Sequence, residues 1–121
     1  MIVLDASAIL AYLRQEPGKP DVRQALHDGA TCSAANWSEV IQKSIHAGRD
    51  INATQQLMAN FGLVIEPVTR ADAEWAAEDW LTHPSLSLAD RLCLALGHRL
   101  SATILTADAA WGESDVITQI R

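Results

Sequence analysis

Four acidic residues stand where short apolar runs end or where helical patterns begin. Asp5 directly follows the first apolar run of the chain, and Asp108 lies two residues beyond a later one that ends at Thr106. Glu39 and Asp90 each fall in the first turn of a predicted helix. If the apolar runs are parallel strands, their carboxyl ends meet at one edge of a sheet, where ligands usually bind. We therefore expect these four carboxyl groups to converge at that edge.

Carboxylates that converge in this way repel one another unless a cation lies among them. Mg²⁺ and Mn²⁺ prefer oxygen ligands and are usually held by a few carboxylates and several waters. None of the four histidines has the spacing of a metal site, and the sequence has only two cysteines. Each acid alone also has an ordinary structural explanation, as a helix-dipole partner or as a cap of a turn or strand end. Spacing alone leaves both explanations open.

The elements that would position these acids alternate between strand and helix. Short apolar runs predict strands at 2–4, 31–34, 63–65 and 102–106, with a final edge strand at 114–118. Helical spacing and capping residues predict helices at 6–16, 21–27, 36–48, 52–61, 70–81 and 88–99, with Asn52 and Ser87 as N-caps. This alternation is typical of an α/β sandwich around a parallel sheet of four to five short strands.

Composition is that of one ordinary globular domain. The chain has 121 residues, of which 49% are hydrophobic and 20% charged, and it contains no repeat or linker. A chain of this length buries enough surface to fold without disulfides, so we predict a single domain over residues 1–121. Two cysteines, Cys32 and Cys93, are too few for a disulfide scaffold and are expected to be buried thiols in a reducing compartment.

Charge and hydropathy constrain the partners. No run approaches the length of a membrane span, and the first residues lack a basic leader, so we expect a cytoplasmic protein with no membrane partner. The net charge of −6 repels nucleic acid, so any chemistry on nucleic acid needs a metal ion or a local basic patch. Arg14 and Arg91 are candidates for phosphate contacts. Lys43 is more simply an i,i+4 partner of Glu39.

Four segments in order resemble the motifs of the PIN-domain family, most closely the toxins of VapBC-type toxin–antitoxin modules. The first is Met1-Ile2-Val3-Leu4-Asp5-Ala6-Ser7-Ala8, with Glu16-Pro17-Gly18 at the usual distance. The others are Ser33-Ala34-Ala35-Asn36-Trp37-Ser38-Glu39-Val40, Leu86-Ser87-Leu88-Ala89-Asp90-Arg91 and Leu105-Thr106-Ala107-Asp108-Ala109-Ala110-Trp111. Each motif alone is weak, but four in order across nearly the whole chain form a specific signal.

This resemblance implies a three-layer α/β/α sandwich and a Mg²⁺-dependent endoribonuclease, with Mn²⁺ as a possible substitute. Asp5, Glu39, Asp90 and Asp108 would then be the catalytic and metal-binding acids. Ser7 and Thr106 would orient them by hydrogen bonds. A metal-activated water would attack a phosphodiester of RNA. The resemblance also implies the toxin of a type II toxin–antitoxin system, with a cognate antitoxin and a homodimeric assembly.

Three alternative functions require other residues than those found here, or fewer of them. A catalytically silent PIN module that binds RNA or a protein partner shares the fold but has no need of four converging acids. A phosphatase of the haloacid dehalogenase type needs a second Asp two residues after Asp5, where this chain has Ser7. A receiver-type signalling domain needs adjacent acids after the first strand, and Leu4-Asp5-Ala6 does not supply them. Substitution of Asp5 by Asn distinguishes a nuclease from a binding module.

Overall fold

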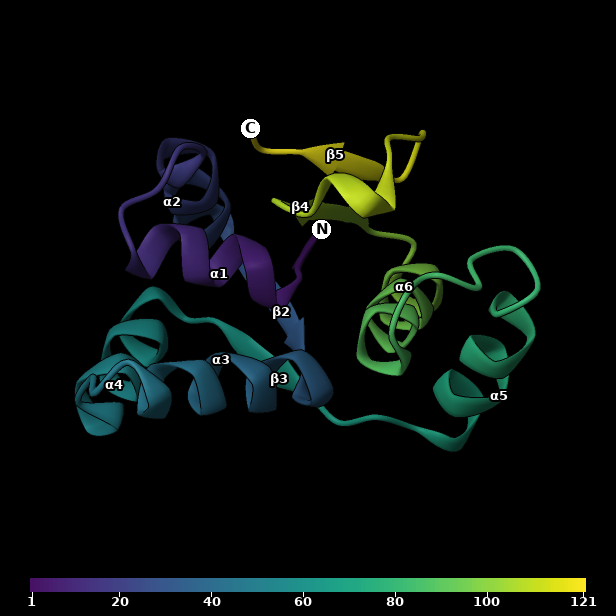
Figure 1. The fold of residues 1–121 in the computed structure, drawn as a ribbon. Coiled ribbons are helices and arrows are strands. Elements are labelled where there is room, and N and C mark those ends of the chain that lie inside the picture. The colour runs from purple at the N-terminus through teal and green to yellow at the C-terminus, as the bar shows by residue number, and fades with distance from the viewer.

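A five-stranded, fully parallel sheet forms the centre of the computed structural model, which describes residues 1–121 (Figure 1). The strand order is β3-β2-β1-β4-β5, with β1 in the middle. The predicted parallel α/β sandwich is therefore confirmed. The strands are β1 (Ile2–Leu4), β2 (Ala30–Ser33), β3 (Val64–Glu66), β4 (Thr103–Thr106) and β5 (Ile117–Gln119).

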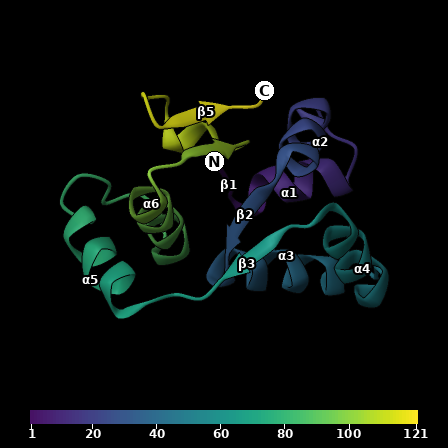
Figure 2. The ribbon, with the colours of Figure 1, turned by 180° about the vertical axis from the view of Figure 1, so that it is seen from behind.

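Helices connect the strands and cover both faces of the sheet. Figures 1 and 2 show α1 and α2 together on one side, and α5 and α6 together on the other. The third helix packs against both α1 and α6, and so it spans the two layers. The helices are α1 (Ala6–Leu13), α2 (Lys19–Asp28), α3 (Ala34–His46), α4 (Ile51–Phe61), α5 (Arg70–Asp79) and α6 (Leu88–Leu100), with a short 3₁₀ helix η1 (Ala109–Trp111).

Two hydrophobic cores lie on opposite faces of the sheet, because successive side chains of a strand point to opposite faces. In β1, Leu4 joins the core beneath α1, α2 and α4, whereas Val3 joins the core beneath α6. In β4, Leu105 joins the core beneath α1, α2 and α4, whereas Ile104 joins the core beneath α6. Both faces of the central strands are thus buried, which explains why these strands read as continuous apolar runs rather than alternating ones.

The first helix ends at Leu13, three residues earlier than the sequence predicts. Pro17 was the expected stop, but a left-handed turn at Gln15 (φ 55°) ends the helix first. The Glu16 N–H donates to the carbonyl of Ala11 at 2.8 Å, and the Gln15 N–H donates to that of Tyr12 at 3.2 Å. These two bonds make a Schellman motif, which usually has glycine at the left-handed position and was therefore invisible in the sequence.

Other boundaries differ for local reasons. The second helix begins at Lys19 rather than Asp21, since Pro20 is compatible with a first helical turn. The N-cap of α4 is Asp50, whose side chain accepts from the Ala53 N–H, and not Asn52. The last strand begins at Ile117 instead of residue 114, because the Ser114 hydroxyl accepts from the N–H groups of residues 116 and 117 and holds them in a turn.

The structure also bears on the two cysteines and on the hydrophobicity of the helices. Cys32 and Cys93 are both buried free thiols, as predicted. Burial raises the pKa of both thiols, so neither is a thiolate at neutral pH. None of the helices has the length and hydrophobicity that crossing a membrane requires.

Candidate functional site

Asp5 lies at the junction of β1 and α1, where it is almost completely buried with 2% of its surface exposed. Its backbone continues the sheet, since the Asp5 N–H donates to the Leu105 carbonyl at 3.2 Å. Its side chain caps α1, with Oδ1 accepting from the Ala8 N–H at 2.8 Å. One residue therefore ends the central strand, begins the first helix and places a carboxyl group at the carboxyl edge of the sheet.

Two hydroxyl groups hold this carboxyl group in place. Thr106, at the end of the neighbouring strand β4, donates to Asp5 Oδ2 at 2.6 Å. The Ser7 hydroxyl lies 2.8 Å from Oδ1 and 2.9 Å from Oδ2 and accepts from the Ala107 N–H at 2.9 Å. These bonds tie the ends of β1 and β4 to one side chain, and they agree with the orienting role expected of Ser7 and Thr106.

Asp108 follows β4 and faces solvent at the same edge. Its N–H donates to the Thr106 hydroxyl at 3.0 Å, so the residue is linked to Asp5 through one shared hydroxyl group. Its Oδ1 accepts from the Ala110 N–H at 2.9 Å and caps η1. The second carboxylate oxygen has no hydrogen-bond partner within the chain and is available to a ligand.

Asp90 lies in the first turn of α6, in a capping box with Ser87. The Asp90 N–H donates to the Ser87 hydroxyl at 3.1 Å, and Asp90 Oδ2 accepts from the Ser87 N–H at 3.4 Å. This reciprocal arrangement begins the helix and fixes the carboxyl group near its N-terminus. The predicted N-cap at Ser87 is confirmed.

Glu39 lies one turn into α3 and is half-buried. Its neighbour Asn36 is completely buried, and its amide nitrogen lies 3.5 Å from Glu39 Oε1 and 3.3 Å from the Ala89 carbonyl. Asn36 thus connects α3 to the start of α6, directly beside Asp90. No role was predicted for Asn36, whose one signal in the sequence is a polar side chain three positions before an acid on the inner face of a helix.

Electrostatic coupling shows that the four acids share one region. Burial raises the pKa of Asp5 to about 6, against the opposing effect of its hydrogen bonds and with a further rise from Asp90. Burial and Asp90 also raise the pKa of Glu39. The pKa of Asp90 itself is raised by burial and by Asp108, against the effect of its bonds to Ser87. Asp90 is therefore the member that interacts with all three others.

The side chains do not form a ready-made chelating cluster. No group of three or more His, Cys, Asp or Glu side chains lies close enough to hold a metal ion directly. The available donors are nonetheless carboxylate oxygens that repel one another, and the buried Asn36 amide oxygen has no partner. Such an all-oxygen set fits a hard cation that retains part of its water shell and takes only one or two protein ligands.

The candidate basic residues are placed differently from one another. Arg14 is exposed just after α1 and lines a cavity with Ser7 and Asp108. Arg91 instead donates from Nη1 to the Ala76 carbonyl at 2.6 Å, so its guanidinium holds α5 against α6. The expected phosphate contact through Arg91 stays a prediction, for a guanidinium that is already engaged within the chain. Lys43 forms no ion pair within 4.0 Å, but its charge lowers the pKa of Glu39 and Asp90.

Solved structures with the same architecture include a toxin and toxin–antitoxin complexes. A toxin–antitoxin complex from Klebsiella pneumoniae has a TM-score of 0.79 at 18% identity, and the match covers 100% of this chain and 98% of that one. VapC20 from Mycobacterium tuberculosis, a toxin that cleaves the sarcin–ricin loop, has a TM-score of 0.69 at 17% identity over 96% of this chain and 98% of that one. The FitAcB structure from Neisseria gonorrhoeae has a TM-score of 0.69 at 23% identity, over 91% and 89%.

These identities are low, so the structural matches establish a shared fold. Comparison with curated protein sequences finds no significant match. The family model for the PIN domain, however, matches residues 2–115, which include all four acids and both hydroxyl-bearing residues of the site. The chain belongs to the PIN-domain family.

Proposed function

We propose that this protein is a Mg²⁺-dependent endoribonuclease and acts as the toxin of a type II toxin–antitoxin system, with Mn²⁺ as a substitute cation. The observation that carries the proposal is a buried Asp5 carboxyl group at the carboxyl edge of the sheet, held by Ser7 and Thr106 and linked through the Thr106 hydroxyl to Asp108. The match to the PIN-domain family supports it, because the matched residues include all four acids. Burial of mutually repelling carboxyl groups destabilises their ionised forms, and it is common at functional sites.

In this proposal Asp5 and Asp90 are the principal cation ligands, with Glu39 and Asp108 completing the acidic site. When bound, the cation supplies charge stabilisation at the phosphate and promotes ionisation of water. The chain itself keeps the carboxyl groups in position. Ser7 and Thr106 hold Asp5, Ser87 holds Asp90, and Asn36 lies against Glu39. Such supporting bonds generally contribute 10- to 100-fold to metal affinity or activity, as an order of magnitude.

The partners follow from the solved relatives. Three of the similar structures are described as a toxin–antitoxin complex, a DNA-bound VapBC from Salmonella typhimurium and FitAcB. By analogy we propose a cognate antitoxin for this chain, and RNA as its substrate. VapC20 makes the sarcin–ricin loop of ribosomal RNA a reasonable first substrate, beside total cellular RNA.

The test is RNA cleavage by purified protein from which any bound partner has been removed. We expect cleavage with Mg²⁺ or Mn²⁺, none with EDTA, and losses of at least about 100-fold for Asp5→Asn and for Asp90→Asn. The matched control is Asp115→Asn, because Asp115 is an exposed acid with no side-chain hydrogen bond. Cleavage that persists in both site variants or in EDTA would contradict the metal-dependent mechanism.

Retention of RNA binding without cleavage, by folded and partner-free protein with Mg²⁺ present, would favour the catalytically silent binding module. In that case Asp5→Asn would leave RNA binding and the associated phenotype unchanged. A nuclease would instead lose its cellular toxicity with the same substitution. Comparison of the parent protein with Asp5→Asn therefore distinguishes the nuclease from the binding module.

A further inference from the structure

The basic side chains of this acidic protein divide into two groups. Three arginines on the α5–α6 side are engaged within the chain: Arg70 with Glu74 at 3.0 Å, Arg99 with Asp72 at 2.9 Å, and Arg91 with the Ala76 carbonyl. The remaining cations lie elsewhere, and several of them line cavities. With a net charge of −6, any surface that attracts a polyanion must draw on these remaining cations.

One cavity brings three of them beside the acidic site. It has a volume of about 300 Å³ and is lined by Arg14, Lys43 and Arg121 together with Ser7 and Asp108. The three cations come from three separate parts of the fold, namely the end of α1, the last turn of α3 and the residue that follows Ile120 beyond β5. We call these three residues the basic cluster. Glu16 and Asp108 also line the cavity, so three positive charges face two negative ones and a single net positive charge remains.

Arg121 is anchored to the backbone of the site. Its Nε donates to the Ala107 carbonyl at 3.3 Å, and its Nη1 lies 3.8 Å from Glu16 Oε2. The N–H of Ala107 in turn donates to Ser7, which is hydrogen-bonded to Asp5. The guanidinium group is therefore held near the buried carboxyl group through one peptide unit and one hydroxyl group, while 38% of the side chain is exposed.

Lys43 and Arg14 are not neutralised by partners in the chain. Neither forms an ion pair within 4.0 Å, and both are exposed at the cavity. Lys43 is close enough to the acids for its charge to lower the pKa of Glu39 and Asp90. Two free cations and one anchored arginine thus border a cluster of acids that would otherwise repel an RNA strand.

We propose that the basic cluster binds a backbone phosphate of the RNA strand next to the phosphodiester at the acids, and so sets the position of the strand. This inference rests on the proposed function, because it assigns a substrate subsite to the same edge of the sheet. Positive charges in the adjacent cavity offset the repulsion between the acids and the phosphates of the strand, because nearby charges act on a bound strand more strongly than the net charge of the protein does. Arginine and lysine contacts to phosphate position a strand without reading its sequence.

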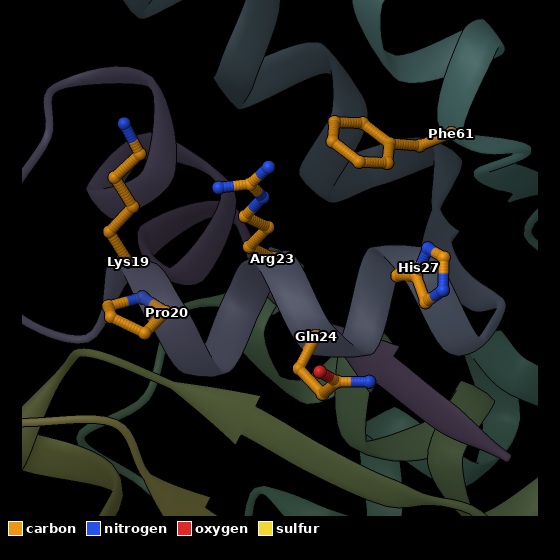
Figure 3. Close-up of a pocket in the computed structure, with 6 residues that line it drawn as sticks. All are labelled: Lys19, Pro20, Arg23, Gln24, His27 and Phe61. Carbon is orange, nitrogen blue, oxygen red and sulfur yellow. The ribbon is translucent and has the colours of Figure 1, made fainter.

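A second basic cavity supplies a matched comparison. It is lined by Lys19, Arg23 and His27 of α2, with Phe61 facing them from the end of α4 (Figure 3). Its volume of about 350 Å³ is similar, but none of the four acids lines it. Arg23 is therefore an exposed arginine in a basic cavity away from the acids, and it is a stricter control than Arg70.

The experiment measures binding of a short fluorescein-labelled single-stranded RNA by anisotropy, in EDTA, over a series of KCl concentrations. Arg14→Ala, Lys43→Ala and Arg121→Ala are each expected to weaken binding by roughly 3- to 10-fold. Each should also reduce the slope of log affinity against log salt, and the triple alanine variant should reduce it by about 0.7, the value for one phosphate contact on a single strand. Arg23→Ala and Arg70→Ala are expected to leave affinity and slope unchanged.

If the cluster acts through charge, the charge-conserving variants Arg14→Lys and Arg121→Lys keep the salt slope of the parent protein. Thermal unfolding verifies that each variant is folded. Equal affinity and slope in the parent and in all three alanine variants would overturn the inference, as would an equal loss in Arg23→Ala. Cluster-dependent binding of polyglutamate without cluster-dependent binding of RNA would also overturn it, because the cavity would then receive carboxylates of a protein partner.

Failure of the proposed function has a different signature. If the parent protein binds RNA and cleaves it with Mg²⁺ while the cluster variants behave like the parent, only the phosphate subsite is wrong. If the parent neither binds nor cleaves RNA at low salt, both the function and the subsite are wrong. Since binding is measured in EDTA and cleavage in Mg²⁺, the two results are independent.

Discussion

At the scale of single residues, the site depends on how Asp5 is buried. The carboxyl group accepts hydrogen bonds from Ala8, Ser7 and Thr106, yet burial outweighs them and raises its pKa to about 6 from the ordinary value of 3.8. The folded protein therefore binds a proton at Asp5 more tightly than the unfolded chain does. Without a divalent cation, stability should fall as the pH rises from about 4 through the folded pKa.

Asp5→Asn removes this pH-dependent loss, because the amide resembles the protonated acid in shape and hydrogen bonding. In EDTA we expect the variant to be more stable than the parent at pH 8, by up to about 3 kcal/mol for a shift of this size, and nearly equal at pH 4. Urea unfolding at the two pH values measures the difference, with Asp115→Asn as the control. A variant less stable than the parent at both pH values would contradict this account.

Thr106→Val tests the buried hydroxyl that connects Asp5 with Asp108. Thr106 is completely buried and donates at 2.6 Å, so replacing its hydroxyl with a methyl leaves polar groups without partners. We expect a loss of about 1–3 kcal/mol in unfolding free energy, together with a roughly 10- to 100-fold loss of cleavage. Thr103→Val, on the same strand but without a side-chain hydrogen bond, should change neither quantity appreciably.

At the scale of elements, helix starts place the acids. Asp5, Asp90 and Asp108 each accept from a backbone N–H at the start of α1, α6 or η1, so the same bonds begin a helix and orient a carboxyl group. Carboxylates are also favoured there by the helix dipole. The site is thus built from local capping signals, and the sheet brings the capped ends together.

A second capping box in the same chain makes it possible to separate the effect of Ser87 on stability from its effect on cleavage. Thr69 and Asp72 begin α5 with the same reciprocal bonds as Ser87 and Asp90, but away from the acidic site. Ser87→Ala and Thr69→Ala should each cost about 1 kcal/mol in stability. Only Ser87→Ala should also reduce cleavage and Mg²⁺-induced thermal stabilisation, by roughly tenfold in apparent metal affinity. Equal effects of both variants on cleavage would show that Ser87 acts through stability alone.

At the scale of the whole molecule, charge is separated between the two sides of the sheet. The three arginines near α5 and α6 are engaged within the chain, whereas Arg14, Lys43 and Arg23 form no ion pair within 4.0 Å and Arg121 is only partly neutralised by Glu16. The net charge of −6 therefore describes the average surface, and the proposed basic cluster would offset it locally beside the acids.

The surface also retains large apolar side chains that a second molecule would cover. Trp80, Leu81 and Leu88 are 53%, 79% and 58% exposed, where α5 ends and α6 begins. In agreement with the expected homodimer, we predict a molar mass by light scattering, at micromolar concentration, that is twice the 13.1 kDa of one chain. Leu81→Glu should shift that mass toward the monomer, whereas Gln56→Glu on exposed α4 should not. A monomeric parent protein would contradict the prediction.

Much of this architecture was predictable, because strands buried on both faces and capped helices leave local signals. The five strands, the six α-helices and the N-cap at Ser87 were all expected, and errors were confined to element ends such as Leu13 and Ile117. Those ends depend on a left-handed Gln15 and on the side-chain bonds of Ser114, and neither follows from periodicity. The four acids were likewise selected from the sequence because each follows an apolar run or lies in the first turn of a predicted helix.

The contacts between side chains and distant elements were decided by tertiary structure alone. Thr106 reaches Asp5 across 101 positions of sequence, Asn36 reaches Ala89 across 53, and Arg91 reaches the Ala76 carbonyl across 15. The basic cluster is likewise assembled from α1, α3 and the residue after β5. A sequence pattern specifies which residues begin and end elements, because those rules are local. Distances between side chains on different elements depend on strand order and helix packing, which only the folded chain determines.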